Sequence, residues 1–98
     1  MKCEMTQNGK ELTVKVEGRL DTATAPELQE KLIPQLKEID HLILDFSDLQ
    51  YISSAGLRVV LMAHRSLAMG GITEATHCNS VVKEVFEITG LTDVIRVS

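Results

Sequence analysis

The first residues of the chain alternate between apolar and polar side chains. Leu12, Val14 and Val16 are separated by polar residues, and this period of two predicts a strand with one buried face. The dipeptide Asn8-Gly9 precedes them, and Asn-Gly is the strongest two-residue signal for a hairpin turn. The amino-terminal part therefore predicts two strands joined by a tight turn.

The apolar spacing then becomes helical in residues 19–40. Every third or fourth position is apolar, at Leu28, Leu32, Leu36 and Ile39. This spacing predicts a helix with one buried stripe. Thr24 and Glu27 have the spacing of a capping box, and Pro26 is tolerated in a first helical turn. Pro34 lies inside the pattern and should kink or shorten the helix.

The middle of the chain predicts a buried strand, a loop and a second helix. Residues 41–46, HLILDF, are almost continuously apolar, as expected for a strand inside a sheet. After the loop 47–54, a helical pattern begins near Ala55 and ends at Gly70-Gly71. We expect the buried side of this helix to carry Leu57, Val60 and Leu61.

The last third predicts one more strand, one more helix and a short tail. Residues 72–78, ITEATHC, alternate loosely and are expected to form a strand because of what flanks them. The following pattern is helical, with Asn79 or Ser80 as its cap and Gly90 as its end. Residues 91–98 then predict a turn and a short final strand.

This order of elements predicts an α/β fold with a mostly parallel sheet after an amino-terminal hairpin. In such sheets, the loops at the carboxyl ends of the strands lie along one edge, where ligands and partners bind. We expect the loops 19–22, 47–54 and 78–80 to meet there. With 98 residues, the chain is long enough for a single domain, residues 1–98, with one modest core.

Charge and cysteine content narrow the functional classes. The net charge of −4 argues against direct binding of nucleic acid, which needs a basic surface. No apolar run approaches the roughly 18 residues of a membrane span, and no signal-peptide pattern opens the chain. Cys3 and Cys78 lack metal-ligand spacing and fit reduced thiols. We therefore expect a cytoplasmic protein.

Two adjacent hydroxyls, Ser53 and Ser54, lie where the loop 47–54 meets the second helix. A serine just before a helix can accept a hydrogen bond from an unpaired backbone N–H and so act as a cap. A phosphoryl group at the same place would be stabilised by the N–H donors and the helix dipole. The residues themselves leave both roles open, a helix cap or a modifiable hydroxyl that controls a partner.

Enzymatic chemistry has little support in the sequence. A hydrolase needs a nucleophile, a base and an orienting group, and ISSAG around Ser54 is not the G-x-S-x-G elbow. His41 and His64 are expected away from the loop edge, and only His77 could approach it. Gly56 stands alone and makes no phosphate-binding loop. We expect no enzyme activity, no metal site and no cofactor.

Residues 44–61, LDFSDLQYISSAGLRVVL, resemble the signature of the STAS domain family. This is the fold of bacterial anti-sigma factor antagonists and of sulphate-transporter tails. Residues 16–32, VEGRLDTATAPELQEKL, and 81–91, VVKEVFEITGL, resemble the first helix entry and the last helix of the family. The resemblance implies a small mixed β-sheet with helices packed largely on one side.

The resemblance also implies a phosphorylation switch. In the family, a serine at the start of this helix is phosphorylated by an anti-sigma factor that is also a serine kinase. The unphosphorylated form binds that kinase and releases a sigma factor, and a PPM-type serine phosphatase resets the switch. Many members have Asp before the hydroxyl pair, whereas this chain has Ser53 there and Ala55 in the last hydroxyl position. Ser54 is therefore the expected acceptor, with Ser53 in reserve.

The partner-binding surface implied by the resemblance lies around the same helix start. It consists of Asp21, Thr22, Ser53, Ser54, Ala55, Gly56 and Arg58. Asp21 matches a family aspartate implicated in phosphorylation, although Asp also commonly fills loop and cap positions for structural reasons. The alternative function is a non-switched accessory subunit or scaffold of a membrane transport system, because STAS domains also serve transporters.

Overall fold

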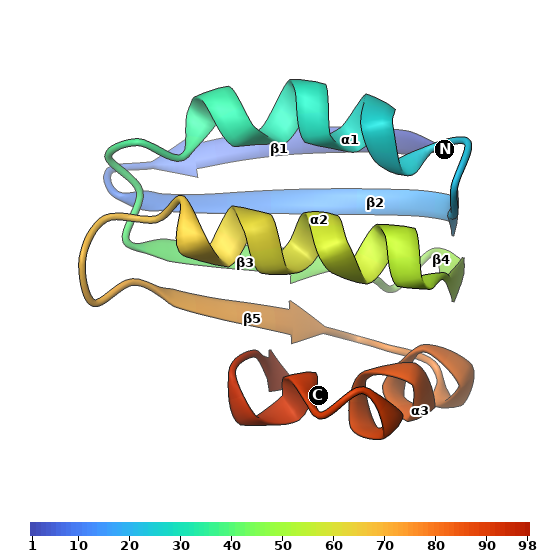
Figure 1. Ribbon diagram of the computed structural model, residues 1–98. Helices are drawn as coiled ribbons and strands as arrows, with labels where there is room; N and C mark the ends of the chain where they lie inside the picture. Colours follow the sequence, from blue (N-terminus) through green and yellow to red (C-terminus); the bar gives the residue numbers. More distant parts are fainter.

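The computed structural model describes residues 1–98, which form a six-stranded sheet and three α-helices (Figure 1). The strands are β1 (Lys2–Asn8), β2 (Glu11–Leu20), β3 (His41–Asp45), β4 (Leu49–Ile52), β5 (Ile72–Thr76) and β6 (Arg96–Val97). The helices are α1 (Ala25–Leu32), α2 (Ser54–Arg65) and α3 (Ser80–Ile88), with 3-10 turns at Ile33–Gln35 and Leu91–Asp93. None of the helices is long and apolar enough to cross a bilayer.

The sheet confirms the predicted mixed, mostly parallel arrangement. The strand order is β1-β2-β3-β5-β6, and β4 pairs with β2. The β1–β2 hairpin is antiparallel, and every other pair is parallel. Gly9 has a left-handed φ of +63° in the tight turn, as the Asn-Gly signal predicts.

Strand β2 has two partners in succession. Its first half pairs with β3, from Glu11 opposite His41 onward, and its last three residues pair with β4. The change of partner coincides with a register shift between Gly18 and Arg19. Gly18 has a φ of +92°, which few residues other than glycine adopt, so this position allows the strand to bend from one partner to the next.

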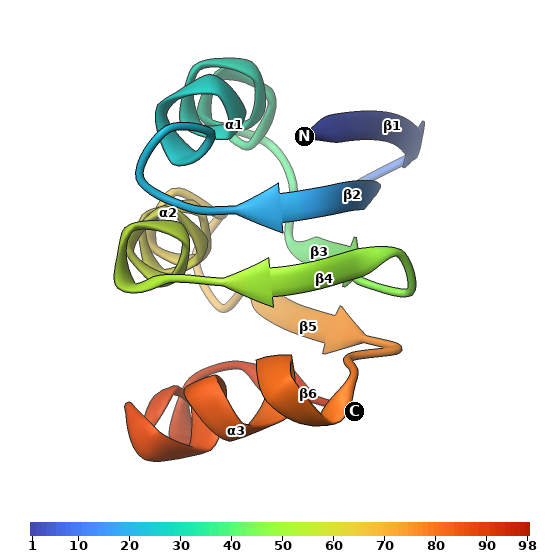
Figure 2. The ribbon, with the colours of Figure 1, turned by 90° about the vertical axis from the view of Figure 1, so that its right-hand side faces the viewer.

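The apolar core lies between the sheet and the helices. Figure 2 shows α1 and α2 on one side of the sheet, with α3 beside β5 at its edge. The alternating residues of β2 that were predicted to be buried, Leu12, Val14 and Val16, are at most 2% exposed. Leu28 and Leu32 of α1 are buried in the same apolar core. The helices therefore lie largely on one side, as the resemblance implies.

Strand β4 contradicts the prediction of a loop over residues 47–54. Leu49–Ile52 forms a parallel strand against the end of β2, and Leu49 and Ile52 are buried. The loop is consequently reduced to a short turn before β4 and to Ser53 after it. This strand fixes the position of the residues that follow it.

One helix end agrees with its prediction and another does not. Pro34 shortens α1, which ends at Leu32 and continues as a 3-10 turn, as expected for proline inside a helix. The end predicted for the second helix at Gly70-Gly71 is wrong, because α2 ends at Arg65. The Ser66 hydroxyl donates to the Met62 carbonyl oxygen at 2.8 Å and closes the last turn.

The buried side of α2 is rotated relative to the prediction. Leu57 and Val60 are buried, together with Val59 and Ala63. Leu61 is only partly buried, so its predicted place in the core is wrong. It lines a groove between α2 and the end of α3 instead.

Candidate functional site

The carboxyl ends of β2 and β4 bring two of the predicted loops together. The backbone N–H of Ser53 donates to the carbonyl oxygen of Leu20 at 2.9 Å. The chain therefore passes from β4 to α2 while held against the end of β2. This contact confirms that the segments 19–22 and 47–54 meet at one edge of the sheet.

The two serines at the start of α2 have different environments. Ser53 is the N-cap residue in extended conformation, but its hydroxyl makes no capping hydrogen bond. Its Oγ atom is buried and has no hydrogen-bond partner. Ser54 is the first helical residue, and it is exposed. Only the Ser54 hydroxyl is thus accessible to another molecule.

The amino end of α2 carries no compensating negative charge. Its first turn contains no acidic residue, and the first intrahelical bond runs from the Leu57 N–H to the Ser53 carbonyl oxygen at 3.0 Å. The preceding N–H groups of the turn, on Ser54, Ala55 and Gly56, have no backbone partner. A helix end of this kind stabilises an anion through its N–H groups and dipole.

Gly56 fixes the distance between α2 and the sheet. A Cβ atom at this position would lie 2.9 Å from the Leu20 carbonyl oxygen and 2.8 Å from Cγ1 of Ile52. The absence of a side chain therefore allows the first turn of α2 to pack directly on β2 and β4. This packing sets where the adjacent Ser54 is presented.

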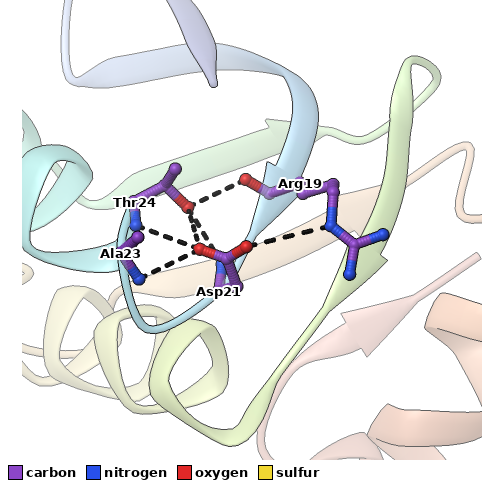
Figure 3. A network of polar contacts seen from close by, with 4 residues as sticks. All are labelled: Arg19, Asp21, Ala23 and Thr24. Atoms are coloured by element: carbon purple, nitrogen blue, oxygen red, sulfur yellow. Dashed lines mark hydrogen bonds and ion pairs between the residues drawn. The ribbon is translucent and has the colours of Figure 1, made fainter.

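Asp21 organises the turn between β2 and α1 (Figure 3). Its Oδ1 atom accepts from the N–H of Ala23 at 3.0 Å and from that of Thr24 at 3.1 Å. The N–H of Thr24, and then that of Ala23, hold the pKa of the Asp21 carboxyl below its usual range. The structure thus gives Asp21 a local structural role at the site edge.

The predicted capping box of Thr24 and Glu27 is wrong. The Thr24 hydroxyl donates to the Arg19 carbonyl oxygen at 2.8 Å and accepts from the Asp21 N–H at 2.9 Å, so it is used within the turn. Thr24 occupies the N-cap position without a side-chain cap bond. The Glu27 carboxylate is 3.9 Å from Nζ of Lys31 on the helix surface.

Arg19 and Tyr51 form a contact that sequence reasoning missed. The Arg19 guanidinium lies 4.6 Å from the centre of the Tyr51 ring, in cation–π geometry, and its Nε is 3.8 Å from Oδ2 of Asp21. The two residues are opposite each other in the β2–β4 pairing. No signal in the sequence joins them, because their contact depends on the unpredicted strand β4.

The third predicted loop, residues 78–80, contacts β4 through Asn79 and does not join the other two loops at Ser54. Its Oδ1 atom accepts from the Val82 N–H at 2.8 Å, which confirms Asn79 as the cap of α3. Its Nδ2 atom donates to the carbonyl oxygens of Leu49 at 3.1 Å and Gln50 at 3.4 Å. The segment 78–80 therefore contacts the beginning of β4, whereas Ser54 follows its end.

Each histidine has a polar partner remote from the serine pair. Nδ1 of His64 is 2.7 Å from Oγ1 of Thr73, and Nδ1 of His77 is 3.7 Å from a carboxylate oxygen of Asp45. His41 lies between two carboxylates on the open face of the sheet, those of Glu11 and Glu74. The histidines thus serve contacts of the sheet and of α2.

Comparison with known proteins identifies the family. The family model described as "STAS domain" matches residues 2–98. The chain belongs to the STAS domain family. The anti-sigma-B factor antagonist of Bacillus subtilis (strain 168) is 30% identical, and the alignment covers 97% of this chain and 88% of that protein. This STAS domain is therefore of the anti-sigma factor antagonist type.

Solved structures share the STAS fold at lower identity. The crystal structure of an anti-sigma factor antagonist from Mycobacterium paratuberculosis has a TM-score of 0.88 at 18% identity, over 98% of this chain and 83% of that one. The Bacillus cell fate determinant SpoIIAA in its phosphorylated form has a TM-score of 0.75 at 22% identity, over 99% and 91% of the two chains. These structures agree with the mixed sheet and helices described above.

The predicted site residues of this STAS domain are distributed around two turns. Ser53 immediately precedes α2, Ser54, Ala55, Gly56 and Arg58 lie in its first part, and Asp21 and Thr22 lie in the turn after β2. Thr22 and Arg58 are exposed. Ser54 and Arg58 line a groove of about 280 Å³ between α2 and the end of α3. Their roles in partner binding remain predictions.

Proposed function

We propose that this STAS domain is switched by phosphorylation of Ser54. The unphosphorylated protein binds an anti-sigma factor that is also a serine kinase, and this binding releases a sigma factor. The observation that carries the proposal is the exposed Ser54 hydroxyl at a helix start that has no side-chain cap and no acidic residue in its first turn. The anti-sigma-B factor antagonist of Bacillus subtilis, related over nearly the whole chain, supports the same class of partner.

The burial of the two hydroxyls supports Ser54 rather than Ser53 as the acceptor. A kinase must bring the γ-phosphate of ATP in line with the attacking oxygen. The buried Oγ of Ser53 offers no such approach, whereas Ser54 lies on the surface. Ser53, which was kept in reserve as acceptor, is better explained as a small residue packed at the β4–α2 junction.

A phosphate on Ser54 is expected to preserve the fold and to weaken the complex. It adds about −1.5 to −2 charges at pH 7. Near the amino end of α2 this charge is stabilised by about 0.3–1 kcal/mol. In a partner interface the same group would have to lose its water, which is costly unless cations compensate. The modification therefore acts on binding and leaves the domain intact.

A phosphorylation switch also needs a phosphatase and a supply of ATP. A phosphorylated antagonist needs a hydrolase to restore it, and we propose a PPM-type serine phosphatase for this step. The kinase step consumes ATP, so the protein is expected to act in the cytoplasm. In this cycle the STAS domain is a substrate and a binding module, and it contributes no catalytic group of its own. SpoIIAA has been solved in unphosphorylated and phosphorylated forms, so the fold is compatible with the modification.

The acceptor assignment is tested by intact-mass measurement and site mapping after incubation with a candidate anti-sigma factor kinase and ATP. Ser54→Ala should take up no phosphate and should still bind the kinase, because the rest of the surface is unchanged. Ser53→Ala is the matched control and should be phosphorylated as fully as the wild-type chain. Full phosphorylation of Ser54→Ala together with loss in Ser53→Ala would reverse the assignment.

Binding of the Ser54→Asp variant tests the switch itself. One carboxylate only partly imitates a phosphate, so its affinity for the kinase should fall while its melting curve stays unchanged. Each 1.4 kcal/mol of lost contact corresponds to about tenfold in Kd, measured by calorimetry. Unchanged binding of Ser54→Asp, together with unchanged binding after phosphate uptake, would favour a constitutive scaffold such as a transporter accessory subunit.

A further inference from the structure

The side chain of Asn79 joins α3 to β4. Its oxygen accepts from the Val82 N–H at 2.8 Å in the first turn of α3. Its nitrogen donates to the carbonyl oxygens of Leu49 at 3.1 Å and Gln50 at 3.4 Å in β4. The acceptor and donor ends of one amide therefore bind two elements about thirty residues apart in the sequence.

Strand β4 depends on such contacts because it is short and has one strand partner. It comprises four residues, and it pairs only with the last part of β2. It also lies against α3. Among the side chains of α3 and its cap, only Asn79 donates hydrogen bonds to the carbonyl oxygens of β4.

The position of β4 is transmitted to Ser54 over a very short distance along the chain. β4 ends at Ile52, Ser53 follows, and Ser54 is the first residue of α2. A displacement of β4 along or away from β2 would therefore move the acceptor hydroxyl. Group transfer is sensitive to such shifts, since a misplacement of about 1 Å can reduce a rate a hundredfold.

We propose that Asn79 is a positioning residue for phosphorylation of Ser54. It holds β4 from the α3 side, while the Leu20 carbonyl oxygen holds the Ser53 N–H from the β2 side at 2.9 Å. The inference rests on the proposed function of Ser54 as phospho-acceptor. It assigns to Asn79 a second role beyond capping α3.

Two substitutions separate tethering from capping. Asn79→Ser keeps an oxygen that can cap α3, because Ser and Asn are comparable caps, but it removes the amide donor. Asn79→Asp also keeps the cap and adds a favourable charge at the helix start. It places a carboxylate oxygen opposite the Leu49 and Gln50 carbonyl oxygens, where it repels them. If Asn79 acts only as a cap, Asn79→Asp should disturb the structure no more than Asn79→Ser. If it also tethers β4, Asn79→Asp should disturb the structure more than Asn79→Ser.

The first measurement needs no kinase. Amide hydrogen exchange and ¹⁵N–¹H spectra of the free chain report directly on β4 and on Ser54. In both variants the β4 amides should exchange faster, by about tenfold or more, because local opening is no longer resisted from the α3 side. The Ser54 amide resonance should shift. The exposed neighbour Ser80, substituted in Ser80→Ala, is the matched control and should change neither observable.

The second measurement is the kinetics of Ser54 phosphorylation by the anti-sigma factor kinase. The variants should lower kcat, about tenfold for Asn79→Ser and further for Asn79→Asp, with KM within about twofold, because the docking surface stays in place. Unchanged β4 exchange and an unchanged Ser54 resonance in both variants would overturn the tether. Altered exchange with an unchanged kcat would overturn the positioning role.

Failure of the proposed function gives a different result. In that case the wild-type chain takes up no phosphate from the kinase, and the Asn79 variants cannot differ from it in kcat. The positioning role would then be rejected, because there is no transfer to position. The exchange experiment would still report whether Asn79 holds β4.

Discussion

Helices α2 and α3 begin in nearly the same backbone conformation and are held in different ways. Ser53 has φ −100° and ψ 177°, and Asn79 has φ −73° and ψ 172°, so both cap residues are extended. The Asn79 side chain caps its helix, whereas the Ser53 hydroxyl makes no hydrogen bond. The start of α2 is instead held by β2 and β4, through the Ser53 N–H and the close packing of Gly56.

This difference in anchoring explains how the start of α2 can be held in place while its backbone N–H groups stay free to bind an anion. A side-chain cap consumes an N–H group that an incoming anion could use. Packing from the sheet side positions the first turn of α2 without consuming any of these donors. The two helix starts therefore have different roles. Asn79 caps α3 and hydrogen-bonds to β4, whereas the uncapped start of α2 leaves Ser54 exposed.

The largest expected effect comes from Gly56→Ala. The added Cβ would meet the Leu20 carbonyl oxygen and Ile52 at less than 3.0 Å, so α2 must move away from the sheet. Overpacking of this kind costs about 1–3 kcal/mol, partly offset by the better helix propensity of alanine. Urea denaturation measures the loss in free energy of unfolding. Ser54→Ala, in the same turn but exposed, should stay within about 0.5 kcal/mol. Equal stability of both variants would refute packing as the anchor of α2.

The next largest effect is the difference in stability between variants of the two cap residues, Asn79 and Ser53. Asn79→Ala removes a side chain that caps α3, which costs about 1 kcal/mol. Ser53→Ala removes a buried hydroxyl without a partner, so it should be neutral or stabilising by up to about 1 kcal/mol. The two melting temperatures should therefore move in different directions or by clearly different amounts, at roughly 4–8 °C per kcal/mol for a domain of this size. A similar loss in both variants would mean that Ser53 caps α2 after all.

The smallest effect concerns α1, whose preceding turn is held by a titratable group. The pKa of Asp21 is below its usual value of 3.8 because the Thr24 and Ala23 N–H groups donate to the carboxylate. Its stabilising contribution is therefore complete above about pH 3.8 and is lost as the pH falls through the lower folded value. The amide resonances of Ala23 and Thr24 should shift below pH 3.8, while that of Val82 at the Asn79 cap should not follow this titration.

Asp21→Asn provides the control for the acid titration. The amide retains an oxygen acceptor for the two N–H groups and does not titrate in this range. The Ala23 and Thr24 resonances should then lose their dependence on pH below 3.8. If the shifts persist in Asp21→Asn, a different carboxylate controls this turn.

Local patterns predicted most of the elements because those elements carry their own signals. The period of two around Val14 and the apolar run of β3 mark strands, and Asn79 followed by an amphipathic segment marks α3. Each of these signals is contained within a few residues. The resemblance to the STAS signature added the acceptor role expected for Ser54, whereas periodicity alone left its role open between cap and acceptor.

The features that were missed depend on partners distant in the sequence. Strand β4 has four residues and no clear alternation, and it exists because the end of β2 lacks another neighbour. The orientation of α2 is set by Gly56 against the sheet, which turns Leu61 out of the core. The Thr24 hydroxyl is diverted from capping by the Arg19 carbonyl oxygen. These features are determined by tertiary contacts, which override the local conformational preference of the sequence.

Strand β2 pairs with three strands, and the separation of each pairing along the sequence predicts the order in which they form. Its hairpin with β1 closes through a tight turn, and hairpins form within about 1–10 μs. Its pairing with β4 joins Leu20 to Ile52, and contacts so distant in the sequence form later because chain entropy must be lost first. Pulse-labelled refolding should therefore protect the amide of Val14 before that of Leu20, and simultaneous protection would contradict this order. The surface around Ser54 therefore forms after the hairpin, so under the function proposed above a kinase would act on the folded domain.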